Sequence, residues 1–163
     1  GQNTIERLMA KYGYSREQVQ ANRKVISERA AAVGMRMRMG DDNRSFNTFD
    51  AHRLLHWADT VGTEQQLALK KALFSAYFIE GLSPADHAVL QRKAEEAGLD
   101  AERTRQILAS DEFAAEVRER EAFYQSQGIR SVPAVIINDR HLISGGQPAE
   151  VFAQALRQIA EAA

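Results

Sequence analysis

Three side chains with metal-binding potential follow one another at helical spacing: His52, His56 and Asp59. Positions three and four apart share one face of a helix, and imidazole and carboxylate groups on such a face can bind a metal ion. No further ligand or supporting hydrogen-bond partner is evident in the sequence. We therefore expect no metal or other cofactor here and interpret both histidines as surface or packing residues.

A proline marks the entrance of the one convincing strand, which lies within Ile129–Asn138. Four apolar residues follow Pro133, a pattern typical of a strand buried on both faces of a sheet. Proline cannot donate a hydrogen bond to the ladder, so it belongs at the start of a strand or in a special turn. The Val132–Pro133 bond is a candidate for the cis form, and a trans bond at an ordinary strand start is the open alternative.

A further candidate site lies at the start of an expected helix. Asn47 and Thr48 precede the segment that carries His52 and Trp57. Either side chain can accept hydrogen bonds from the first free N–H groups of the helix, and Asp50 in its first turn suits the helix dipole. Helix capping therefore explains these residues without a ligand.

Composition excludes several classes of function. The 163 residues contain no cysteine, which excludes disulfides, thiolate catalysis and cysteine-bound metals within them. The net charge is −1, so neither nucleic acid nor an acidic membrane surface is favoured as a partner. No apolar run approaches the length of a membrane span, and no signal peptide is evident.

The elements that must position these residues are mostly helices. Glycines follow helical patterns where a left-handed C-terminal residue is wanted, and capping boxes are expected at Asn3, Ser15 and Thr63. Proline at a first helical position is expected after Ser83 and Gln147. The pattern predicts helices at 4–12, 15–33, 48–61, 64–80, 84–97, 101–109, 111–127 and 148–161.

Two segments outside the helices have alternating or strand-like patterns. Met35–Met39 alternates methionine with arginine, and we interpret it as an extended loop with its methionines turned inward. His141–Ser144 is the partner expected for the Pro133 strand, with the last helix covering one face of the sheet. Two strands alone do not make a stable sheet, so we expect part of the sheet to lie outside this sequence.

The string Ser-Gly-Gly-Gln-Pro at 144–148, together with Asn47–Leu54, Trp57–Ala58 and Ala72–Gly81, resembles the FrnE-like branch of the DsbA family. The resemblance covers nearly the whole chain. It implies an α/β thioredoxin-like fold with a large helical insertion, in which this chain is mostly helical with one C-terminal β-hairpin followed by a helix. It further implies a connecting helix at 1–14, the helical insertion at 15–127 and the C-terminal half of the thioredoxin-like domain at 128–163.

The sequence departs from the family at one point. The family pattern begins with a strand–helix–strand unit carrying Cys-x-x-Cys, and nothing here matches it. The resemblance thus implies a protein thiol–disulfide oxidoreductase or isomerase whose redox cysteines lie outside the given chain, with no catalytic residue inside it. Val132 and Pro133 would bind an extended thiol or disulfide peptide through the backbone before the proline. Asn47 would touch the same substrate.

Two other functions remain open. Kappa-class glutathione transferases and 2-hydroxychromene-2-carboxylate isomerases share the helical insertion and the Val-Pro loop, although the Ser-Gly-Gly-Gln-Pro string argues against them. A redox-inactive binding module is the other alternative. Since the FrnE-like branch usually lacks a secretion signal, we expect a cytoplasmic protein. The unpaired strand edge predicts a homodimer or strand exchange for this chain.

Overall fold

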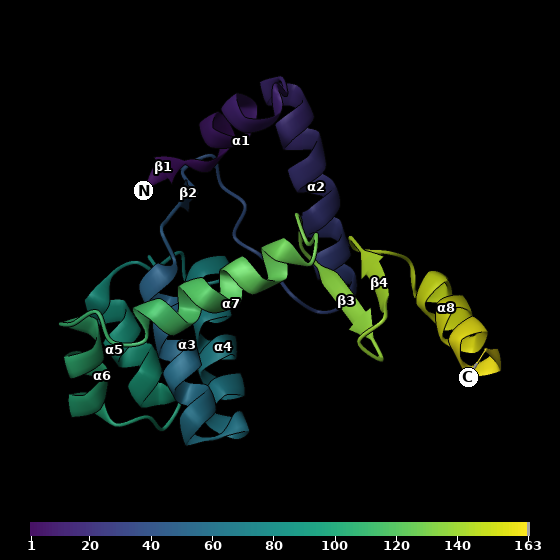
Figure 1. The fold of residues 1–163 in the computed structure, drawn as a ribbon. Helices are drawn as coiled ribbons and strands as arrows, with labels where there is room; N and C mark the ends of the chain where they lie inside the picture. Colours follow the sequence, from purple (N-terminus) through teal and green to yellow (C-terminus); the bar gives the residue numbers. More distant parts are fainter. Residues whose placement is uncertain (163) are drawn as a thin grey trace. The chain divides into compact units, whose positions relative to one another are not determined.

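The chain forms two compact units, Gly1–Val117 and Arg118–Ala163. The computed structural model describes residues 1–162 (Figure 1). Within these residues, none of the helices has both the length and the apolar character needed to cross a membrane. The fold is mostly helical with a C-terminal hairpin followed by a helix, as the sequence predicts.

Four helices build the core of the first unit: α3 (Phe49–Val61), α4 (Thr63–Phe78), α5 (His87–Glu96) and α6 (Ala101–Leu108). Each helix packs against the next one along the chain, and α3 also contacts α6. Their shared core consists mainly of leucine, alanine, isoleucine and tryptophan side chains. The fully buried members include Leu54, Leu69, Leu90 and Ile107. Burial of such side chains contributes roughly 1.5–3 kcal/mol each to folding.

A smaller structure precedes the four helices. It comprises β1 (Gln2–Asn3), α1 (Thr4–Tyr12), α2 (Arg16–Ala32) and β2 (Arg44–Ser45). The strands pair antiparallel, with Gln2 opposite Ser45 and Asn3 opposite Arg44. Sequence reasoning missed this pair. At the start of α2, the predicted capping box of Ser15 and Gln18 is present with both of its hydrogen bonds.

The segment between α2 and β2 follows the predicted pattern. Met35, Met37 and Met39 are half-buried, whereas Arg36 and Arg38 are exposed. The segment is therefore a loop whose methionines are less exposed than its arginines, in agreement with the predicted pattern.

Several predicted helix starts were wrong, including that of the helix predicted at 111–127, which begins at Ala114. Gly62, not Thr63, precedes α4 and makes no side-chain cap. α5 begins at His87, because the Asp86 carboxylate accepts hydrogen bonds from the backbone N–H groups of Ala88 and Val89. A carboxylate that caps a helix outweighs the preference of Pro84 for a first helical position.

The second unit begins at Arg118, within α7 (Ala114–Ser126). It also contains β3 (Ala134–Ile137), β4 (His141–Ser144) and α8 (Ala149–Glu161). The strands form an antiparallel hairpin, with Ala134 opposite Ser144 and Ile137 opposite His141. Both Asn138 and Asp139 in the hairpin loop have φ near +55°, a conformation that asparagine and aspartate tolerate better than most residues.

The expected burial of this unit is not found. Within 118–162 no residue is buried: Val135 is 38% exposed, Ile136 44% and Leu156 of α8 52%. The prediction that β3 is buried on both faces, with α8 as a cover, is therefore wrong for the residues described. A two-stranded sheet cannot bury both faces of a strand without covering layers.

Candidate substrate-binding site

The loop before β3 carries the first two residues predicted to bind substrate. The Val132–Pro133 peptide bond is cis, the first of the two alternatives that the sequence left open. The Val132 side chain is 87% exposed, so it makes almost no packing contact within the structure. The carbonyl oxygen of Pro133 accepts a hydrogen bond of 2.8 Å from the Gly145 N–H, which fixes the loop to the end of β4.

The Ser-Gly-Gly-Gln-Pro string has a local structural role. Gly145 has φ +78°, a conformation that glycine adopts without steric cost. Gln147 donates a hydrogen bond from Nε2 to the carbonyl oxygen of Ser144 at 3.0 Å. The string thus ends β4, ties it to Pro133 and turns the chain towards α8.

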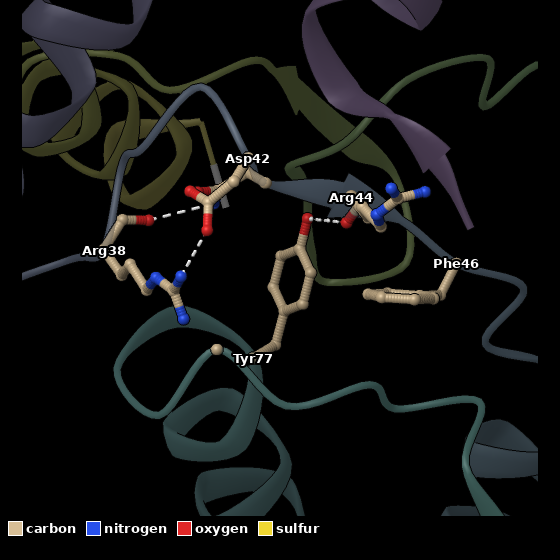
Figure 2. A pocket seen from close by; sticks show the side chains of 7 residues that line it. Arg38, Asp42, Arg44, Phe46 and Tyr77 are labelled. Atoms are coloured by element: carbon tan, nitrogen blue, oxygen red, sulfur yellow. Dashed lines mark hydrogen bonds and ion pairs between the residues drawn. The ribbon is translucent and has the colours of Figure 1, made fainter.

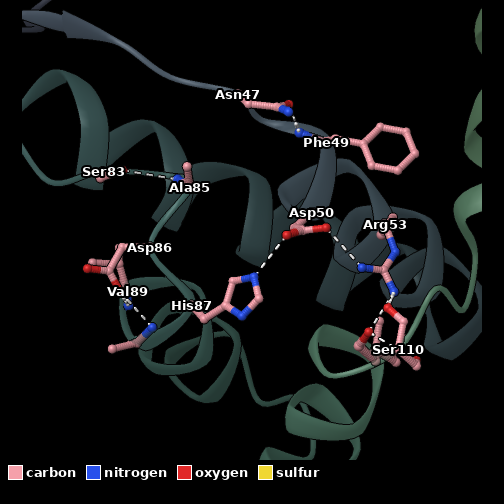
Figure 3. Close-up of polar contacts among 12 residues, drawn as sticks. Asn47, Phe49, Asp50, Arg53, Ser83, Ala85, Asp86, His87, Val89 and Ser110 are labelled. Atoms are coloured by element: carbon pink, nitrogen blue, oxygen red, sulfur yellow. Dashed lines mark hydrogen bonds and ion pairs between the residues drawn. The ribbon is translucent and has the colours of Figure 1, made fainter. Parts of the chain in front are cut away.

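The third candidate, Asn47, lies in the first unit at the start of α3. Its side chain is exposed, and its Oδ1 accepts a hydrogen bond of 3.0 Å from the Phe49 N–H (Figure 3). Asn47 therefore caps the start of α3 with its side chain, whereas Thr48 makes no side-chain cap. The Nδ2 group of Asn47 remains a possible donor to a ligand.

One turn into α3, Asp50 links two helices. Its Oδ1 accepts from Nη1 of Arg53 and its Oδ2 contacts Nε2 of His87, both at 2.9 Å (Figure 3). Arg53 is 3% exposed and also donates to the carbonyl oxygens of Ile107, Ser110 and Glu112. This one guanidinium therefore fastens α3 to the turn that follows α6. Sequence reasoning left His87 without a partner, since 37 positions separate it from Asp50.

Acid should weaken this linkage. Burial raises the pKa of Asp50, but hydrogen bonds from His87 and Arg53 outweigh it, so the pKa lies below its ordinary value of about 3.9. A carboxyl group whose pKa is lowered in the folded state stabilises the protein at pH values above its ordinary pKa. This contribution disappears as the pH falls through the lowered pKa. We expect Asp50→Asn to flatten the loss of stability below about pH 4. Urea unfolding at a series of pH values measures this, and an unchanged acid dependence would contradict it.

The histidine pair shows no sign of a metal site. His52 is exposed, whereas the ring of His56 packs against that of Phe113 with centroids 5.4 Å apart. Within residues 1–162, no group of three histidine, aspartate or glutamate side chains is arranged to hold a metal ion. Nδ1 of His56 is buried without a hydrogen-bond partner in the same part of the chain.

The aromatic residues that could form a cleft for clients divide into two groups. Trp57 is buried in the helical core. Phe74, Tyr77 and Phe78 form a partly exposed cluster, with Tyr77 and Phe78 packed edge to face at 4.8 Å.

Comparison with known proteins agrees with the fold. Residues 2–157 match the family described as the DSBA-like thioredoxin domain. The chain belongs to this DsbA-like family. A crystal structure of a probable DsbA oxidoreductase from Streptomyces coelicolor is 40% identical, with a TM-score of 0.87, over 96% of this chain and 67% of that one. None of the curated proteins gives a significant match.

Proposed function

We propose that this DsbA-like chain is the substrate-binding part of a protein thiol–disulfide oxidoreductase or isomerase of the FrnE-like type. The observation that carries the proposal is the family match over residues 2–157, which includes the Val132–Pro133 loop. The solved relative's description as a probable oxidoreductase supports it. The chain has no cysteine, so the attacking thiolate and its partner cysteine come from outside these residues.

In this proposal, disulfide exchange and substrate binding are carried out by different parts of the protein. A thiolate attacks one sulfur of a disulfide and expels the other sulfur as a thiolate, leaving a mixed disulfide that a second thiolate resolves. The proposed role of this chain is to hold the substrate peptide in an extended form against the backbone of Val132, next to Pro133. Asn47 is a separate proposed substrate contact, through its side-chain amide group.

The test compares two substitutions at Val132 in the form of the protein that contains the redox cysteines. Val132→Pro removes the backbone N–H, and we expect peptide disulfide exchange to slow about tenfold, the cost of one lost hydrogen bond. Val132→Ala keeps the backbone, and because the side chain is exposed it should behave like the wild type. Equal rates for all three proteins, with unchanged unfolding, would contradict the substrate role. The residues 1–163 alone should show no exchange activity.

A glutathione-dependent transferase or isomerase is the second candidate. No contact among the residues that the structure describes favours it, but the residue at the start of the redox helix would decide: serine in place of the first cysteine points to this class. Glutathione turnover without disulfide exchange would overturn the oxidoreductase proposal.

We also propose that residues 1–163 associate with a second copy of themselves. β3 pairs only with β4 among the described residues, which leaves its other edge unpaired. Phe123, Ile136 and Leu142 line an open hollow of the same unit and are each more than 40% exposed. Unpaired edges beside apolar surface favour strand pairing between chains. Size-exclusion chromatography should show a dimer or exchanged oligomer, whereas a monomer at all concentrations would contradict this.

A further inference from the structure

A pocket in the first unit combines basic and aromatic side chains. It lies between the loop before β2 and the end of α4 and has a volume of about 80 Å³ (Figure 2). Arg38 and Asp42 contribute from the loop, Arg44 and Phe46 from β2 and the residue after it, and Tyr77 from α4. Of these side chains, only Tyr77 also belongs to the partly exposed aromatic cluster described above.

The walls of this pocket are held in place by specific contacts. The Tyr77 hydroxyl donates to the carbonyl oxygen of Arg44 at 2.9 Å. The rings of Phe46 and Tyr77 meet edge to face with centroids 6.3 Å apart. The backbone N–H of Arg38 donates to the carbonyl oxygen of Phe78. Gly81 leaves the space that Arg38 fills, because a Cβ atom there would lie 2.1 Å from its Nη1.

The charges that line the pocket favour an anion. Two guanidinium groups, those of Arg38 and Arg44, accompany one carboxylate, that of Asp42. Asp42 pairs with Nη2 of Arg38, and Nη1 of Arg44 donates to the carbonyl oxygen of Gly1. The other N–H groups of both arginines have no partner among the described residues and can donate to an oxyanion in pairs. A cation would meet two arginines and an aspartate that is already neutralised.

The aromatic walls define the rest of the ligand. The rings of Phe46 and Tyr77 line the same pocket as the two arginines and offer apolar surface there. The volume admits a carboxylate and a few further atoms, well below the roughly 300 Å³ of a pocket that encloses a drug-sized molecule. The bulk of a larger ligand would therefore remain outside.

We propose that this pocket binds a carboxylate joined to an apolar group. Arg44 and Arg38 would hold the carboxylate, and the rings of Phe46 and Tyr77 would contact the apolar part. Free organic acids and the C-terminal residue of a peptide both present this chemistry. The proposal does not rest on disulfide exchange, because it concerns ligand binding by other residues.

Direct binding to residues 1–163 tests the proposal, with calorimetry and NMR shifts of residues around Tyr77 as the readouts. The probes are 3-phenylpropionate and the peptide Gly-Gly-Phe, each compared with its uncharged amide. Both carboxylates should bind at least tenfold more tightly than their amides. A tighter peptide identifies a chain terminus as the source, and a tighter free acid identifies a small molecule. Equal binding of acid and amide would overturn the proposal.

Three variants test which side chains of the pocket determine carboxylate binding. Arg44→Gln should weaken carboxylate binding at least tenfold while keeping the Tyr77 hydrogen bond, which uses the Arg44 backbone. Asp42→Asn should tighten binding about threefold or more, because it removes a repulsive charge and frees Arg38; a misfolded variant could not produce this gain. Arg36→Gln, an exposed arginine of the same loop outside the pocket, is the matched control and should change nothing. Weaker carboxylate binding by Asp42→Asn would overturn the assignment of ligand charge.

Discussion

Replacing Arg53 by methionine is expected to lower the free energy of unfolding of the helical unit by about 3–5 kcal/mol. The guanidinium is nearly inaccessible to water and donates to the carbonyl oxygens of Ile107 and Glu112 at 2.6 and 2.7 Å. Methionine has a similar length but no donor, so the carbonyl oxygens of Ile107 and Glu112 and the Asp50 carboxylate would each lose a hydrogen bond, although Asp50 keeps its contact with His87. Unpaired buried polar groups cost far more than the net gain of the original bonds.

The turn held by Arg53 would also rearrange, and the relaxation of its backbone would offset a small part of this loss. Phe113, just before α7, has φ +62°, which is unusual for a residue with a large side chain. Its ring packs against His56, and the preceding residue, Glu112, is bound by Arg53. Without Arg53 the turn can relax towards a more favourable backbone conformation, which moves the start of α7.

Urea unfolding followed by fluorescence measures the change. Trp57 is the single tryptophan and is buried in the same helical core, so its emission reports on this unit alone. Arg92→Met is the matched control: its pair with Glu96 is solvent-exposed at 3.8 Å and should contribute less than about 1 kcal/mol. Similar losses of unfolding free energy for both variants would show that Arg53 does not stabilise the contact between α3 and the turn after α6.

The second large effect concerns the helical core. Leu54→Ala should destabilise the same unit by about 2–5 kcal/mol, because it leaves a cavity where Leu54 is fully buried. Leu67 of α4 is 50% exposed, so Leu67→Ala should cost less than about 1 kcal/mol. The Trp57 emission again gives the free energies. If Leu54→Ala cost no more than Leu67→Ala, the four-helix core described here would be wrong.

Local signals in the sequence predicted most of the helices. α1 and the strand β4 have the predicted bounds, and α3 and α6 differ from them by one residue. These elements are marked by side-chain caps, glycines at their ends and regular apolar spacing, all of which act within a few residues. α5 was misplaced because two competing start signals, Pro84 and Asp86, lie two positions apart.

Features that depend on distant residues could not be predicted. The pairing of Gln2 with Ser45 joins segments more than 40 positions apart, and each strand has only two residues. The contact between Asp50 and His87 and the pocket around Tyr77 likewise form only after the helices pack. The apolar run after Pro133 correctly predicted a strand, but burial depends on covering layers that no pattern within the strand can specify. Val132, Pro133 and Asn47 remain predicted substrate contacts.

The uneven burial along the chain bears on how the protein is made. Helices α3 to α6 contact mainly their neighbours in sequence, and such local contacts form quickly. A ribosome adds about 5–20 residues per second, so we expect the helical unit to be folded while the hairpin is still being synthesised. The hairpin and α8 then emerge with apolar side chains uncovered. This is the segment where we expect chaperones to bind the nascent chain, next to a domain that is already folded.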